Sequence, residues 1–112
     1  MTASTDDLLS TPESHWHALL RAARVIDAPS DCLVALVGLA AHSIARGETQ
    51  EGADVLAWVL RQSVLSDEIR ETAQELWDEL AARICPRVLL DAADFAAYAT
   101  LDDLCEYVTL PL

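Results

Sequence analysis

The three histidines are the first residues whose type could hold a metal ion. His15 and His17 are two positions apart in a segment with helical periodicity. Their side chains would therefore point about 200° apart around the helix axis and could not chelate one ion together. His42 lies far along the chain from both. We expect no zinc site and interpret the histidines as residues on exposed helix faces.

The three cysteines could supply a nucleophile or form disulfides. Cys32, Cys85 and Cys105 are odd in number and widely spaced, which does not fit a disulfide framework. Only Cys85 has basic residues near it in sequence, Arg83 and Arg87, which could lower a thiol pKa. We interpret all three as structural, mostly buried thiols in a reducing cytoplasm. No spacing suggests a Ser–His–Asp arrangement, so we predict a chain that is not an enzyme and needs no cofactor.

An acidic motif lies near the C-terminus, where Asp102, Asp103 and Glu106 are spaced as D-D-x-x-E. It resembles the metal–diphosphate motif of terpenoid synthases, but those enzymes need a much larger helical barrel than 112 residues can build. Thr100 and Asp103 also have the spacing of a capping box, and acidic residues are favourable at a helix N-terminus. The remaining alternatives are a solvated face or an acidic surface that attracts a basic partner.

Composition restricts the classes of partner. Seven basic residues, all of them Arg, stand against 19 acidic residues, which gives a net charge of -12. Such a chain is a poor match for nucleic acid or an anionic membrane, because both attract basic surfaces. The hydrophobic fraction of 53% predicts a folded core, and 112 residues allow one domain. Neither a secretory signal nor a membrane-spanning stretch is evident, so we expect a cytoplasmic protein.

These residues must be positioned by helices, since apolar residues recur at helical spacing and no strand-like alternation is present. We predict an all-α fold with about six antiparallel helices, either a short α-solenoid or a helical bundle.

Residues 1–10 are expected to be a flexible acidic N-terminus, and residues 11–110 a single helical domain. Ser10 with Glu13, Ser30, Ser66, and Thr100 with Asp103 are the expected helix caps. The expected helices cover about 11–26, 30–46, 50–63, 66–81, 86–96 and 100–108, with Gly47 and Pro111 as stops.

The second expected helix is apolar on every side between residues 33 and 41. Either the other helices surround it as the central core helix, or part of its surface meets another chain. In the second case Val34, Val37, Ala41 and Ile44 would contact the partner. Trp58 lies off the apolar stripe of its own helix. It either covers a neighbouring helix or anchors a partner.

Residues 33–65 resemble one tetratricopeptide repeat, a helical hairpin of about 34 residues. Ala40 and Gly52 occupy the positions of the small pair where the two helices cross, and Gly47 occupies the turn. The sequence departs from the repeat at Ser43, at Val59 and in lacking the terminal Pro. Over about residues 15–108 the chain is similar to the C-terminal end of tetratricopeptide regions in large bacterial signalling and transcriptional regulators. This resemblance implies tetratricopeptide-like helical hairpins and a protein-interaction module.

We therefore carry two functional hypotheses. The first is a non-catalytic scaffold, adaptor or regulatory subunit of a bacterial assembly that binds another protein or itself, with no small-molecule substrate. The second is an acidic inhibitor or antitoxin-like protein that masks a basic site, which the net charge of -12 favours. The candidate partner-binding residues are Val34, Val37, Ala41, Ile44, Trp58, Asp102, Asp103 and Glu106.

Overall fold

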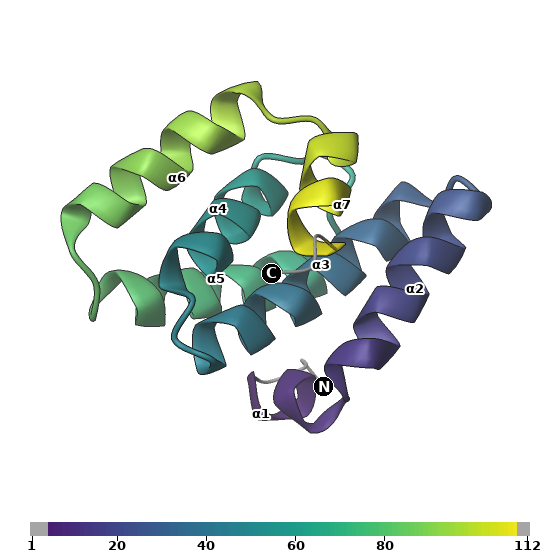
Figure 1. Ribbon diagram of the computed structural model, residues 1–112, viewed down its shortest axis with the longest axis horizontal. Coiled ribbons are helices and arrows are strands. Elements are labelled where there is room, and N and C mark those ends of the chain that lie inside the picture. The colour runs from purple at the N-terminus through teal and green to yellow at the C-terminus, as the bar shows by residue number, and fades with distance from the viewer. Residues whose placement is uncertain (1–4, 110–112) are drawn as a thin grey trace.

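The computed structural model describes residues 5–109, with the side chains of residues 8–108. Over this range the chain is all-α, as predicted, with seven helices and no strand (Figure 1). The helices are α1 Thr5–Ser10, α2 Glu13–Val25, α3 Pro29–Ala45, α4 Thr49–Leu60, α5 Asp67–Ala81, α6 Pro86–Tyr98 and α7 Leu101–Thr109. The six predicted helices correspond to α2–α7. The predicted stop at Pro111 lies outside the described residues.

Helix α3 is the central helix of the fold. Helices α1, α2, α4 and α5 all pack against it, and Figure 1 shows α2 and α4 on either side of it. Its apolar stretch is therefore covered by the chain itself, and Ala35, Leu36 and Ala40 are fully buried. Of the two alternatives for this helix, the described residues show the central core helix. Burial of this stretch gives the hydrophobic free energy that holds the surrounding helices together.

The N-terminal segment differs from the prediction of a flexible residue range 1–10. Residues 5–10 form α1, and Leu8 lies in the core at 5% exposure. The backbone carbonyl of Leu8 accepts a 3.2 Å hydrogen bond from the indole Nε1 of Trp16. The physical reason for the difference is this pair of contacts, which links α1 to α2 and cannot be read from the short polar segment alone. Residues 1–4 lie outside the described range.

Two predicted helix ends are confirmed. Gly47 has φ +88° and ends α3 in a Schellman motif, with its N–H bonded to the Ile44 carbonyl and the Glu48 N–H bonded to the Ser43 carbonyl. The capping box of α7 is reciprocal. The Thr100 N–H donates to Asp103 Oδ2 at 3.0 Å and the Asp103 N–H donates to Thr100 Oγ1 at 3.2 Å.

Of the three other predicted caps, one forms. Ser30 does not cap α3, because α3 begins at Pro29 with Ala28 in the N-cap position and has no side-chain cap. Ser66 caps α5 as predicted and accepts from the Ile69 N–H at 3.4 Å. The predicted box of Ser10 with Glu13 does not form, because α2 begins after Pro12 without a side-chain cap and the Glu13 carboxylate binds Arg46 instead.

Helix α7 is tied to the rest of the fold by both buried and polar contacts. Leu104 and Cys105 are buried in the core. Asp102 at the start of α7 pairs with Arg24 near the end of α2. Near the other end of α7, the hydroxyl of Tyr107 donates a 2.9 Å hydrogen bond to Asp54 of α4. The last turn of α7 is thereby held near α4, where it borders the cleft described next.

Candidate functional site

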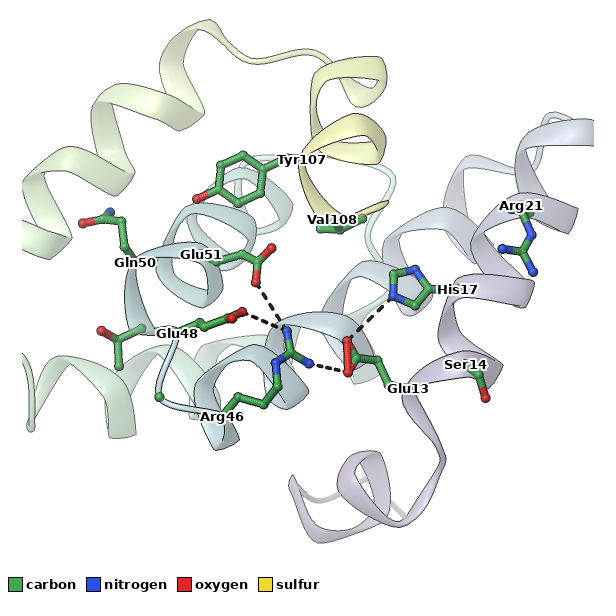
Figure 2. A pocket seen from close by; sticks show the side chains of 12 residues that line it. Glu13, Ser14, His17, Arg21, Arg46, Glu48, Gln50, Glu51, Tyr107 and Val108 are labelled. Atoms are coloured by element: carbon green, nitrogen blue, oxygen red, sulfur yellow. Dashed lines mark hydrogen bonds and ion pairs between the residues drawn. The ribbon is translucent and has the colours of Figure 1, made fainter. Parts of the chain in front are cut away.

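A surface cleft of about 1140 Å³ lies between α2, the α3–α4 turn with the first turn of α4, and the end of α7 (Figure 2). Most of the side chains that line it are polar or charged. Helix α2 supplies one wall, the turn after α3 and the start of α4 supply the opposite wall, and α7 closes one side. The lining residues are Glu13, Ser14, His17, Arg21, Arg46, Gly47, Glu48, Thr49, Gln50, Glu51, Tyr107 and Val108.

Arg46 lies at the centre of the cleft and binds three carboxylates from three different elements. Its Nη1 pairs with Glu13 of α2, and its Nη2 lies 2.9 Å from Glu48 Oε2 in the turn. The same Nη2 lies 3.6 Å from Glu51 Oε2 on α4. In Figure 2 the carboxylates point toward the guanidinium from both sides of the cleft. The Schellman turn at Gly47 makes this possible, because it reverses the chain between Arg46 and the two later glutamates.

The environments of Glu48 and Glu51 shift their pKa values in opposite directions. The hydrogen bond from Arg46 holds the pKa of Glu48 below its usual value. Burial raises the pKa of Glu51, although Ser43 Oγ donates a 2.7 Å hydrogen bond to its Oε2. The hydrogen bonds that Arg46 donates to Glu48 and, with a smaller effect, to Glu13 raise the pKa of Arg46. The guanidinium therefore stays charged, and the proton that the pair of glutamates takes up most readily goes to Glu51.

Beside the cleft, Asp54 and Tyr107 form a second polar contact. Asp54 is 6% exposed and accepts from Gln50 Nε2 at 2.8 Å as well as from Tyr107. Gln50 also donates to the Val88 carbonyl of α6 at 3.3 Å. Burial raises the pKa of Asp54, and burial together with the hydrogen bond to Asp54 raises the pKa of Tyr107. These hydrogen bonds therefore form a network beside the cleft that joins α4, α6 and α7.

The cleft carries more negative than positive charge when its glutamates are ionised. Glu13, Glu48 and Glu51 carry three negative charges when ionised, against the positive charge of Arg46, which lies between them, and that of Arg21, which also lines the cleft. On the α2 wall, His17 lies 3.8 Å from Glu13. Carboxylates that exceed their internal partners leave a negative potential, which a concave surface focuses. The arrangement is suited to holding a positively charged group.

Neither a metal-binding cluster nor a membrane-spanning helix is found among the described residues. Among side chains 8–108, no three His, Cys, Asp or Glu are grouped as a metal site would need. None of the seven described helices is long and apolar enough to cross a membrane.

Cys32 and Cys105 are buried, which raises the pKa of each thiol, and Cys85 is exposed. All three are free thiols.

The structure places none of the eight sequence-predicted partner-binding residues in the cleft. Val37 and Ala41 are buried under the neighbouring helices, and Val34 and Ile44 are half-buried against the core. The hypothesis that Val37 and Ala41 offer a partner surface is therefore wrong, because the chain's own helices cover them. Trp58 is likewise buried, and its Nε1 donates to the Ala99 carbonyl at 2.9 Å, so it covers the α6–α7 connection.

The three acidic candidates are exposed on α7. Asp102 pairs with Arg24, and Asp103 caps the helix that it begins. Glu106 is also exposed. The sequence reasoning missed the cleft itself. Its one available signal was the charged run Arg46-Gly47-Glu48 at a predicted turn, because a turn between two antiparallel helices lies at the end of the hairpin, where other elements can approach it.

Comparisons with models of protein families, with curated proteins and with solved structures gave no match to this chain.

Proposed function

We propose that this chain is a non-catalytic helical module that binds another protein, and that its cleft takes a basic segment of that partner. The observation that carries the proposal is the convergence of Glu13, Glu48 and Glu51 on one cleft around a single Arg46. The tetratricopeptide-like hairpin of residues 33–65 supports the same role, since such hairpins serve in scaffolds, adaptors and regulatory subunits. A bacterial assembly is the setting that this resemblance suggests.

The size and shape of the cleft fit a short segment of polypeptide. At about 1140 Å³ it is somewhat larger than most pockets for small ligands, and it opens onto the surface between three elements. The net charge of -12 would speed association with a basic partner through long-range attraction. The three free thiols support a reducing compartment, so cytoplasmic location is part of the proposal.

A second candidate function is an acidic inhibitor that covers a basic site on its partner. The observation that favours it is a set of exposed acidic residues on α6 and α7, namely Asp91, Asp94, Asp102, Asp103 and Glu106. Such a surface would bind through diffuse charge, and its affinity would fall steeply with salt. Binding in the cleft would depend on particular carboxylates instead.

The test is a fluorescence-anisotropy titration of a labelled hexa-arginine peptide with three proteins. These are the wild type, the double variant Glu13→Gln/Glu48→Gln in the cleft, and the control Glu71→Gln/Glu75→Gln on the exposed face of α5. Both double variants change the net charge equally. We expect the cleft variant to weaken binding by about tenfold or more and the control by less than about twofold.

Two results would contradict the cleft proposal. If both double variants weaken binding equally, the peptide recognises the overall charge and the second candidate is favoured. If the peptide binds none of the three proteins in low salt, neither candidate holds for an arginine-rich segment.

A further inference from the structure

We propose that Arg46 is an internal stand-in for the partner, occupying the carboxylates that a guanidinium of the bound segment takes over. On this view Arg46 competes with the partner's arginine for Glu13, Glu48 and Glu51, and it swings aside when the segment binds. The inference rests on the proposed function of the cleft. It adds the chemical group that the cleft recognises and the contact that restrains binding.

The geometry of the bound guanidinium is the first argument. Nη1 of Arg46 is held by Glu13 on the α2 side, while Nη2 is held by Glu48 at 2.9 Å on the α4 side. Carboxylates on two sides of a planar group match the two-armed shape of a guanidinium better than the compact ammonium of lysine. The cleft therefore already displays, with its own residue, the mode in which it would bind an arginine from another chain (Figure 2).

The exposure of the pairs is the second argument. The Arg46 side chain is 41% exposed, and those of Glu13 and Glu48 are each 36% exposed. Ion pairs this open to solvent contribute little net free energy, so exchanging one guanidinium for another costs little. Arg46 is also the C-cap residue of α3, directly before the turn at Gly47, and its partly exposed side chain can move into solvent.

The charge count is the third argument. With Arg46 in place and Arg21 of α2 also counted, the three carboxylates of the cleft still exceed its two guanidinium groups by one charge when ionised. A cation is therefore attracted to the cleft before exchange begins. Once it arrives, its like charge repels Arg46, and this repulsion favours the displaced position of Arg46.

The experiment compares hexa-arginine binding to the wild type, to Arg46→Gln and to Arg61→Gln. Arg61 is exposed, follows α4 and does not line the cleft, so the two variants lose the same charge at different places. We expect Arg46→Gln to bind the peptide about tenfold more tightly than the wild type, because one like charge is gone from beside the incoming cation. Arg61→Gln should differ from the wild type by less than about twofold. Hexa-lysine should bind Arg46→Gln several-fold more weakly than hexa-arginine does.

Each other outcome has a distinct meaning. If Arg46→Gln and Arg61→Gln tighten binding equally, or if Arg46→Gln binds more weakly than the wild type, the stand-in role is overturned while the cleft proposal stands. If neither the wild type nor Arg46→Gln binds the peptide, the proposed function itself fails. Should circular dichroism show that Arg46→Gln is unfolded, Arg46→Lys replaces it. That variant keeps the charge but loses the second arm, and binding no tighter than that of the wild type would overturn the inference.

Discussion

The hydroxyl of Tyr107, on the last helix, donates a 2.9 Å hydrogen bond to Oδ2 of Asp54, a carboxylate that is 6% exposed on α4. The two residues are 53 positions apart in sequence. This contact fixes the end of α7 beside the middle of α4, and Tyr107 and Val108 then form one border of the acidic cleft. The position of α7, and with it the shape of the cleft, depends on a buried polar contact as well as on apolar packing.

Replacing Tyr107 with Phe removes this hydrogen bond and leaves the ring in place. Among the described residues, Asp54 would keep only the amide of Gln50 as a side-chain donor. We expect the free energy of unfolding to fall by about 1–2 kcal/mol, since a buried acceptor loses a partner. Urea denaturation followed by circular dichroism measures this change. A fall of less than about 0.3 kcal/mol would mean that water replaces the hydroxyl at no cost.

Asp54 should also make stability depend on pH. Burial raises the pKa of Asp54 in the folded state above the ordinary value of 3.8, so the folded protein holds this proton more tightly than the unfolded chain does. The resulting contribution to stability is fully present below pH 3.8 and is lost as the pH rises through the raised folded pKa. As the pH rises through this range, Asp54→Asn should therefore lose less stability than the wild type.

The control for this pH series is Asp94→Asn, an exposed residue of α6 that carries the same charge. Urea midpoints measured at several pH values separate the local effect from relief of the general acidic repulsion. If both variants change the pH dependence by the same amount, burial of Asp54 is not its cause.

The ends of α2 and α3 offer a matched pair of substitutions. Asp27 ends α2 at φ +55°, in the same Schellman arrangement that Gly47 forms at φ +88° after α3. Asp27→Gly should raise the free energy of unfolding by about 0.5–1 kcal/mol, because glycine adopts positive φ without strain and an acidic group leaves a helix C-terminus. Gly47→Ala should lower it by about 1 kcal/mol. Within the described part of the chain, no atom other than those of the two neighbouring residues lies within 4 Å of a Cβ at Gly47, so this cost is one of backbone conformation. Thermal melts that move in the same direction for both variants would contradict the account.

Gly38 is the position where the core tolerates no side chain. A Cβ there would overlap the indole ring of Trp16, whose Nε1 also holds α1 through Leu8. We expect Gly38→Ala to cost about 2–3 kcal/mol and to change the tryptophan fluorescence. At Gly52 a Cβ would meet the Ile44 side chain and lie 3.3 Å from the Ala40 carbonyl oxygen. The half-buried Ile44 side chain can change its rotamer, whereas the indole ring of Trp16 is packed in the core and cannot move easily. Gly52→Ala should therefore cost less than Gly38→Ala. The reverse order in urea denaturation would show that the α2–α3 contact adapts more readily than the α3–α4 contact.

The local parts of this fold could be predicted from sequence because the physics that sets them is local. Ser66, Gly47 and the Thr100–Asp103 box act within a few residues of their own helix ends, and each acts as predicted. Helix α1 was missed, since its six residues show no helical stripe and are held by contacts with α3 and with Trp16, which lie further along the chain.

The cleft could not be predicted, because its contacts join residues far apart in sequence. Glu13 meets Arg46 across 33 positions, and that pairing takes Glu13 away from the capping role its spacing suggested. Trp58 shows the same limit. Its place off the helical stripe fits a partner anchor and an internal contact equally well, and only the position of Ala99 decides between them.

The most direct test of the central claim is a map of chemical-shift changes in ¹⁵N-labelled protein titrated with the hexa-arginine peptide. If the cleft binds a basic segment, the amides that shift most should belong to residues 13–21, 46–51 and 107–108, which border it. The exposed acidic face of α6 should change little. Shifts confined to α6 and the start of α7, or spread evenly over all acidic surfaces, would contradict the claim that this cleft is the binding site.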